Sequence, residues 1–138
     1  MVISKQKNLL ITGSNSRIGS KISLMAAKKG FSVALHFNSN SDKVNYLTES
    51  INKMGVDVFS VKADLRNKKE IKQMFKKIDK KWKNLNGVVN NAAISGKRKS
   101  LLDLKDSEVD EIFKINFFAN FYILKETIIR MKKTGGGS

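Results

Sequence analysis

One segment of the sequence combines residue types and spacing that could bind a phosphate group. It follows the aliphatic residues 9–11 and consists of Thr12, Gly13, Ser14, Asn15, Ser16, Arg17, Ile18 and Gly19. A glycine at position 13 allows a tight turn that a Cβ would forbid, and the short polar side chains after it can cap a following helix. A helix N-terminus presents unpaired N–H groups and a partial positive charge, which favour a bound phosphate. The segment is therefore a candidate nucleotide-binding loop.

A strand and a helix must hold this loop. The uninterrupted aliphatic residues 9–11 are typical of a strand buried on both faces of a parallel sheet, and we expect that strand over about residues 8–12. After the loop, two lysines and Gly30 indicate the end of a helix. Helical spacing predicts that its core-facing residues are Ile18, Ile22, Met25 and Ala26.

The same alternation continues along the chain. Further strands are expected at residues 31–37, 56–63 and 87–89, and residues 38–42 predict a loop that ends in a helix cap. Ser107 and Asp110 resemble a capping box at the start of a long helix that runs towards Met131. The core residues expected on the two intervening helices are Val44, Leu47, Ile51 and Met54, then Ile71, Met74, Phe75, Ile78 and Trp82.

Alternating strands and helices predict an α/β fold, a doubly wound parallel sheet with helices on both faces. We expect one domain over residues 1–138, with four strands in the order 3-2-1-4 and the third strand near an edge. A nucleotide then belongs where the strand order reverses, beyond strands one and four. The candidate loop and the pair Asn90 and Asn91, at the end of strand four, both lie there.

The composition excludes several classes of protein. There is no cysteine and one histidine, so we expect neither a disulfide framework nor a metal site. No apolar run reaches the roughly 20 residues that cross a bilayer. Residues 1–7 lack the features of a secretory signal, which predicts a cytoplasmic protein without membrane contact.

A net charge of +15 suggests nucleic acid as a partner. However, only four of the 27 cationic residues are arginines, and the lysines are spread over every expected helix. Recognition of bases and phosphates draws on arginine forks and aromatic stacking. A solvated, lysine-rich surface is therefore favoured, and nucleic-acid binding is kept as an alternative.

Four features of the sequence resemble the short-chain dehydrogenases/reductases, nicotinamide-dependent enzymes built on a Rossmann sheet. Residues 12–19 are similar to the family's Thr-Gly-x-x-x-Gly-x-Gly phosphate loop. Asp64 and Leu65 are similar to its adenine-binding position after strand three. The other two matches are Asn90, Asn91, Ala92 and Ala93, for its Asn-Asn-Ala-Gly signature, and Asn116, for the Asn of its catalytic set. The resemblance covers essentially the whole chain and implies that the first three features bind the cofactor.

The resemblance implies NADP rather than NAD as the cofactor. An acidic residue at the end of strand two would bind the ribose 2′-hydroxyl of NAD and repel a 2′-phosphate. This chain instead has His36, Asn38 and Ser39 there, with no carboxylate before Asp42. Arg17 replaces the middle Gly of the family loop, as in members similar to pteridine reductase, and its guanidinium could contact the phosphate.

Each of these residues also has a purely structural interpretation. Arg17 could be a solvated residue at a helix start, and His36 is favoured as a polar strand-end residue over a phosphate contact. Asp64 could cap a helix. Asn90 and Asn91 could join the ends of neighbouring strands, and Asn91 is the better cofactor candidate of the two.

The catalytic acid of the family is missing here. The family uses a Ser and a Tyr with a Lys four residues later, and neither Tyr46 nor Tyr122 is followed by such a Lys. The chain therefore resembles the N-terminal half of an NADP(H)-dependent oxidoreductase, which transfers hydride between nicotinamide and a carbonyl or alcohol substrate, and we expect the chain alone to be inactive. The alternatives are a non-catalytic nucleotide-binding module or decayed enzyme fragment, and a basic nucleic-acid-binding protein.

The resemblance also implies a small-molecule carbonyl substrate and a homo-oligomer for the full-length enzyme, paired through the long helix near Ser107. Residues 135–138 could be the turn into a fifth strand or an appended linker. An unpaired fourth strand and the phenylalanine-rich helix predict that the chain alone is marginally stable and aggregates.

Overall fold

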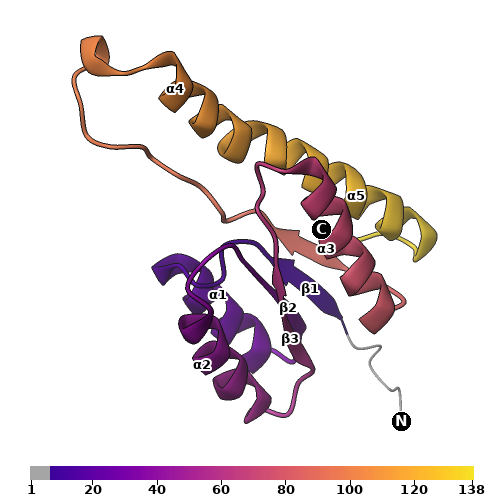
Figure 1. The fold of residues 1–138 in the computed structure, drawn as a ribbon. Coiled ribbons are helices and arrows are strands. Elements are labelled where there is room, and N and C mark those ends of the chain that lie inside the picture. The colour runs from indigo at the N-terminus through magenta and orange to yellow at the C-terminus, as the bar shows by residue number, and fades with distance from the viewer. Residues whose placement is uncertain (1–6) are drawn as a thin grey trace, which may run out of the picture.

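A four-stranded parallel sheet forms the centre of the computed structural model, which describes residues 7–138 (Figure 1). The strands pair in the order β3-β2-β1-β4, which confirms the predicted order and leaves β3 at an edge. With helices around this sheet, the fold is Rossmann-like. The strand bounds are β1 Asn8–Ile11, β2 Ser32–Phe37, β3 Val58–Lys62 and β4 Gly87–Val89.

Helices cover both faces of the sheet (Figure 1). The four that do so are α1 (Arg17–Lys28), α2 (Ser41–Asn52), α3 (Lys68–Lys81) and α5 (Asn120–Lys133). Successive side chains of a strand point to opposite faces, so neighbouring residues enter different cores. Leu10 packs in the core under α3 and α5, whereas Ile11 packs in the core under α1 and α2.

An arm formed after β4 extends away from the sheet (Figure 1). A 3₁₀ turn at Leu101–Asp103 precedes α4 (Asp106–Phe113), and a π-helical segment at Lys114–Ala119 joins α4 to α5. The predicted long helix is therefore not one regular α-helix. A π-helical segment has wider turns than an α-helix and is frequent at functional sites.

Three apolar side chains that helical spacing assigned to the core lie at the surface. Ile18 and Met25 are each 61% exposed, and Met54, just after α2, is 37% exposed. The buried face of α1 consists instead of small residues, namely Gly19, Ser23, Ala26 and Ala27. These small residues let α1 approach the sheet closely, and the stripe that carries Ile18 and Met25 consequently faces solvent.

Two helix starts differ from the predicted ones. Asn40, and not the end of the 38–42 loop, caps α2: it has a φ of 59°, and its Oδ1 accepts a hydrogen bond from the Lys43 N–H at 3.4 Å. In α4, the Glu108 carboxylate accepts from the Lys105 N–H at 3.1 Å. Because this carboxylate already satisfies the free N–H before the helix, α4 begins ahead of Ser107.

Ser138 lies beside β4. Its N–H donates to the Asn86 carbonyl, and its carbonyl accepts from the Val88 N–H, both at 3.0 Å. This is the hydrogen-bond pattern of a parallel neighbour in a sheet.

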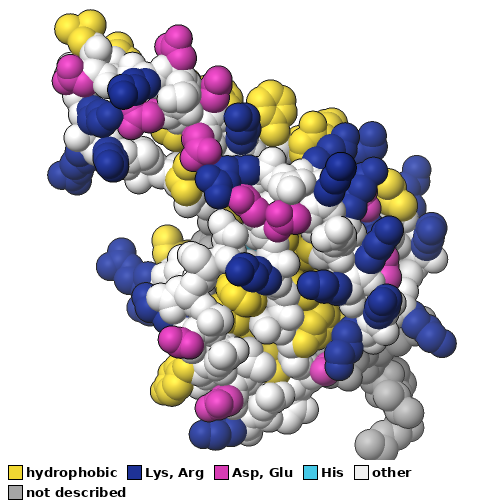
Figure 2. Space-filling view, in the orientation of Figure 1, with side chains coloured by type: hydrophobic (Ala, Val, Ile, Leu, Met, Phe, Trp, Pro, Cys, Tyr) yellow, Lys and Arg dark blue, Asp and Glu magenta, His cyan; other side chains and the backbone are white. Residues whose placement is uncertain are grey.

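Lysine and arginine side chains are spread over α3, α5 and the arm (Figure 2). Within residues 7–138, no helix is long and apolar enough to cross a bilayer. No group of three or more His, Cys, Asp or Glu residues in this range could hold a metal ion. The prediction about a secretory signal concerns residues 1–7 and lies, except for Lys7, outside the described residues.

Candidate functional site

Gly13 and Gly19 allow the loop after β1 to close tightly. Gly13 has a φ of 63°, in the left-handed region, and a Cβ there would lie 3.0 Å from the Ala92 Cα. A Cβ on Gly19 would collide with the Gly13 carbonyl oxygen and would lie 2.8 Å from the Asn91 Nδ2. Both positions therefore require glycine, which gives the two glycines of the sequence motif a packing reason.

The start of α1 leaves backbone N–H groups free for a ligand. Ser16 caps the helix, with its Oγ accepting from the Gly19 N–H at 3.0 Å, and the Ser16 N–H donates to the Gly13 carbonyl at 3.0 Å. Within residues 7–138, the loop amides without an acceptor are those of Asn15, Arg17 and Ile18. These three free N–H groups lie at the positive end of α1, where an anionic group such as a phosphate is stabilised.

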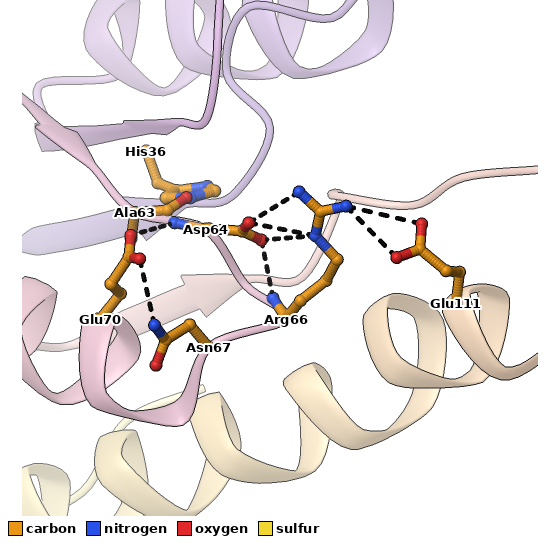
Figure 3. A network of polar contacts seen from close by, with 7 residues as sticks. All are labelled: His36, Ala63, Asp64, Arg66, Asn67, Glu70 and Glu111. Atoms are coloured by element: carbon orange, nitrogen blue, oxygen red, sulfur yellow. Dashed lines mark hydrogen bonds and ion pairs between the residues drawn. The ribbon is translucent and has the colours of Figure 1, made fainter. Parts of the chain in front are cut away.

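His36, at the end of β2, connects this loop to the end of β3. Its Nδ1 accepts from the Gly13 N–H at 3.1 Å. Its Nε2 lies 3.0 Å from the carbonyl oxygen of Ala63, the residue drawn beside it in Figure 3. Its own carbonyl accepts from the Ser14 N–H at 2.8 Å. Burial lowers the pKa of His36 below its usual 6.5. His36 is therefore a buried polar residue near the end of β2 that connects the two loops.

Thr12 and Asn91 join the ends of β1 and β4. Thr12 Oγ1 accepts from the Asn91 N–H at 2.9 Å and from the Ala92 N–H at 3.0 Å. Asn91 Nδ2 donates to the carbonyl oxygens of Thr12 and Gly13 at 2.9 and 3.1 Å. The neighbouring Asn90 has a buried Oδ1 with no partner among residues 7–138. Asn91 thus has the strand-joining role and also faces the loop.

Polar contacts surround Asp64 after β3 (Figure 3). The Arg66 guanidinium holds both Asp64 oxygens, with Nη2 2.7 Å from Oδ2 and Nε 2.9 Å from Oδ1, and this hydrogen bonding lowers the pKa of the carboxyl. Arg66 Nη1 also reaches Glu111 Oε1 on α4, at 3.3 Å. Glu70 accepts from the Asp64 N–H at 2.7 Å. Asp64 does not cap α3, because Asn67 does.

The ends of all four strands meet around a hollow of about 270 Å³. The hydrogen bond from Asn15 Nδ2 to the Ser39 carbonyl, 2.7 Å long, links the β1 loop to the segment after β2 beside it. The predicted site residues that line this hollow are Gly13, Asn15, Ser16, His36, Asn38, Ser39, Asp64, Leu65, Asn91 and Ala92. The tertiary structure therefore brings residues from four separate parts of the sequence to one place.

The other predicted cofactor residues lie around the hollow but do not line it. Thr12, Ser14 and Gly19 belong to the same segment but are buried, whereas Arg17 and Ile18 are exposed at the start of α1. Arg17 lines a neighbouring hollow of about 560 Å³, together with Asp42 and Lys43 of α2. Asn90, the remaining one, is half-buried at the end of β4.

Asn116 lies in the π-helical segment and holds the chain after β4. Its Oδ1 accepts from the Ile94 N–H at 2.9 Å, and its Nδ2 donates to the Ile94 carbonyl at 2.8 Å. Its own carbonyl accepts from Asn120 Nδ2 at 2.8 Å. Because Ile94 lines the 270 Å³ hollow, Asn116 positions one wall of that hollow.

Neither tyrosine of the chain lines this hollow. Tyr46 is 74% exposed on α2, and Tyr122 lies on α5 with the Lys68 Nζ 4.5 Å from its ring centroid. A larger hollow, of about 840 Å³, lies at the opposite ends of the strands around Asn8 and Ser32. It contains no predicted site residue, and the 560 Å³ hollow contains three. Ten predicted site residues line the 270 Å³ hollow, which is therefore the candidate functional site.

Three charged residues of the Asp64 network were not anticipated from the sequence. Arg66 had a local signal, since an Asp side chain often accepts from the N–H two residues on, as the 3.0 Å bond to Arg66 shows. Glu70 is three residues after the cap Asn67, the spacing of a capping box. Glu111 had no such signal, because it is 45 residues from Arg66.

Comparisons with known proteins extend these observations. A family model described as short chain dehydrogenase matches residues 7–138. The 3-oxoacyl-(acyl-carrier-protein) reductase FabG of Staphylococcus epidermidis is 29% identical over 132 residues, which are 96% of this chain and 54% of that protein. This chain therefore spans about half the length of the curated relatives it matches.

Solved structures are similar over the same range. An alcohol dehydrogenase from the archaeon Thermococcus sibiricus, complexed with 5-hydroxy-NADP, has a TM-score of 0.87 and 27% identity over 96% of this chain and 56% of that one. An NAD⁺-bound xylitol dehydrogenase has a TM-score of 0.88 over 95% of this chain and 50% of that one. Its 22% identity limits that likeness to the fold.

Proposed function

This chain belongs to the short chain dehydrogenase family, and on that basis we propose that it supplies the cofactor-binding half of an NADP(H)-dependent oxidoreductase. The whole enzyme transfers hydride between the nicotinamide and a small-molecule carbonyl or alcohol substrate. In this proposal residues 1–138 form one nucleotide-binding domain, the protein is cytoplasmic, and the full-length enzyme is a homo-oligomer.

The observation that carries the proposal is the set of unpaired amides beside the 270 Å³ hollow. The N–H groups of Asn15, Arg17 and Ile18 have no acceptor within residues 7–138, and the absence of side chains at Gly13 and Gly19 keeps the loop close to the helix start. A pyrophosphate fits such a group of donors because it is anionic and accepts several hydrogen bonds at once.

The adenine end of the dinucleotide belongs on the other side of the same hollow. Asp64 and Leu65 line it there, and Arg66 keeps the Asp64 carboxylate ionised and oriented. An ionised carboxylate can accept a hydrogen bond from the amino group of adenine. Asn91 and Ala92 lie along the path between the loop and the nicotinamide end in this proposal.

NADP is proposed over NAD because of the charge around the start of α1. Arg17 is exposed there and lines the 560 Å³ hollow together with Lys43 and Asp42. Asn38 and Ser39 follow β2 with no carboxylate before Asp42. A guanidinium and neutral donors suit a ribose 2′-phosphate. Similar solved structures hold either kind of cofactor, 5-hydroxy-NADP in the alcohol dehydrogenase and NAD⁺ in the xylitol dehydrogenase, so the choice rests on these residues.

The bound cofactor supplies the hydride that reduces a carbonyl, or accepts it from an alcohol. A proton must reach the substrate oxygen as negative charge develops there. No tyrosine lines the hollow within residues 7–138, so we propose that the group that donates this proton belongs to the remainder of the enzyme. Asn116 would contribute by holding Ile94, and with it the wall of the site.

Titration of the purified 138-residue chain with NADPH and with NADH tests the proposal. We expect both to bind, NADPH more tightly, with no turnover of carbonyl substrates. A folded chain that binds neither dinucleotide would contradict the cofactor site. Binding to DNA that falls with salt and is unaffected by NADPH would instead support the nucleic-acid alternative.

A further inference from the structure

The protonation state of His36 follows from its two hydrogen bonds. A carbonyl oxygen only accepts, so the 3.0 Å contact with Ala63 requires a proton on Nε2. Nδ1 accepts from the Gly13 N–H at 3.1 Å and therefore carries no proton. The ring is only 2% exposed, and the described residues hold it as one neutral tautomer.

These two bonds connect the two ends of the candidate cofactor site. Gly13 begins the loop whose later amides are free to bind phosphate, and Ala63 immediately precedes Asp64. Gly13 is 23 residues before His36, and Ala63 is 27 residues after it. One imidazole ring thus bridges two loops that share no direct hydrogen bond among the described residues. It adds to the backbone bonds that hold each loop to β2, from the Ser14 N–H to the His36 carbonyl at 2.8 Å and from the Ala63 N–H to the Phe37 carbonyl at 3.1 Å.

We infer that His36 is a positioning residue for the dinucleotide, which holds the phosphate loop and the Asp64 loop at the separation that one cofactor molecule spans. This inference rests on the proposed function. His36 does not itself donate to a phosphate, because its one N–H is already bonded to Ala63. Its Nδ1 also accepts the hydrogen bond of the Gly13 N–H, so the loop offers the cofactor only the later amides of Asn15, Arg17 and Ile18.

A positive charge on the His36 ring would disrupt these two hydrogen bonds. A second proton on the ring would direct an N–H of His36 towards the N–H of Gly13, and two donors cannot bond to each other. Burial opposes that proton as well, since it lowers the pKa of the ring. The connection therefore depends on a neutral ring with one acceptor and one donor nitrogen.

Substitutions at position 36 separate this role from simple packing. His36→Phe keeps an aromatic ring, of somewhat larger volume, and removes both side-chain bonds, whereas His36→Asn keeps a short amide that can accept from Gly13. We expect NADPH and NADH to bind roughly tenfold or more weakly to His36→Phe, with His36→Asn in between. Thr127→Val is the matched control, because it removes another buried hydrogen bond, 2.8 Å from Thr127 Oγ1 to the Ile123 carbonyl, on α5.

Circular dichroism and thermal melts establish that each variant is folded at the temperature of the titration. If folded His36→Phe binds both dinucleotides as tightly as the unsubstituted chain, the inference is wrong while the proposed function stands. If the unsubstituted chain binds neither dinucleotide, both the inference about His36 and the proposed function are wrong. A purely structural role predicts that Thr127→Val and His36→Phe lose stability alike and keep the same affinity.

Nitrogen-15 NMR provides a readout that does not depend on how well a variant folds. His36 is the only histidine of the chain, so the imidazole signals need no assignment. We expect a neutral ring protonated at Nε2 in the ligand-free chain, with both ring nitrogens shifting when NADPH is added. A ring protonated at Nδ1, or ring signals unchanged by saturating NADPH, would overturn the inference.

Discussion

Arg66 and Asp64 form a two-pronged ion pair at the end of β3, with Nη2 2.7 Å from Oδ2 and Nε 2.9 Å from Oδ1. The side chains are 42% and 27% exposed, so solvent screens their attraction and the pair adds little to stability. Its effect is orientational, because a guanidinium that bonds both oxygens fixes the plane of the carboxylate.

Removing this guanidinium should alter cofactor binding more than folding. We expect Arg66→Ala to change the free energy of unfolding by less than about 1 kcal/mol, to move the pKa of Asp64 up towards its usual 3.8, and to weaken NADPH binding severalfold. Lys99→Ala is the control, since it breaks the 2.8 Å pair with Glu108 elsewhere on the arm. Equal affinities for the two variants would show that Arg66 does not orient Asp64 for a ligand.

Gly19→Ala should damage both the loop and the fold. The added Cβ would collide with the Gly13 carbonyl, so we expect a loss of about 1–3 kcal/mol in the free energy of unfolding and a large loss of NADPH affinity. Urea unfolding and calorimetric titration measure the two effects. Gly55→Ala, where no atom lies within 4 Å of the new Cβ, should leave the affinity unchanged despite a strained φ of +76°.

The preference for NADP should depend on Arg17. We expect Arg17→Ala to weaken NADPH binding roughly tenfold and NADH binding less than about twofold, because only NADPH carries the 2′-phosphate. Lys21→Ala, one turn along the same helix face, is the control for a general loss of positive charge. A parallel fall in both affinities for Arg17→Ala would assign the guanidinium to the pyrophosphate instead.

The stability of the chain should fall in mild acid because of His36. Its folded-state pKa lies below the 6.5 of an exposed His, so the unfolded chain binds the proton first as the pH falls. Its contribution is complete above about pH 6.5 and is lost as the pH falls towards the folded pKa. Urea unfolding at about pH 7.5 and about pH 5.5 measures this loss.

The same experiment on His36→Phe isolates the contribution of the ring. We expect that variant to lose less stability between the two pH values. The lowered pKa values of Asp64 and Glu108 matter only below their usual 3.8 and 4.5, so they leave this window nearly untouched. A pH dependence as steep in His36→Phe as in the parent chain would contradict the assignment.

The chain alone should associate through its exposed phenylalanines. Phe113, Phe117, Phe118 and Phe121 are between 48% and 60% exposed along the arm and α5, and contiguous apolar surface promotes association. We expect light scattering and sedimentation to detect oligomers or aggregates, which Phe117→Lys reduces and Tyr46→Lys, on α2, does not. A monomer that melts cooperatively at high temperature would contradict this expectation.

Local patterns were enough to predict the fold class and the strand order. Aliphatic runs, helical spacing and glycine stops act over a few residues, and alternating elements leave few parallel topologies. The same patterns failed for Ile18 and Met25, since helical spacing alone does not tell which of two stripes on α1 approaches the sheet. The stripe of small residues faces the sheet because small side chains allow the helix to pack closely against it.

The sequence by itself determined the tight loop after β1, because Gly13, the Ser16 cap and Gly19 act within the short segment 13–19. Only the tertiary structure decided what His36 and Arg66 contact. Their partners Ala63 and Glu111 lie 27 and 45 residues away, and no periodicity reports a hydrogen bond over such a separation. Those contacts exist because the parallel strands end at one edge, where residues distant in the chain become neighbours.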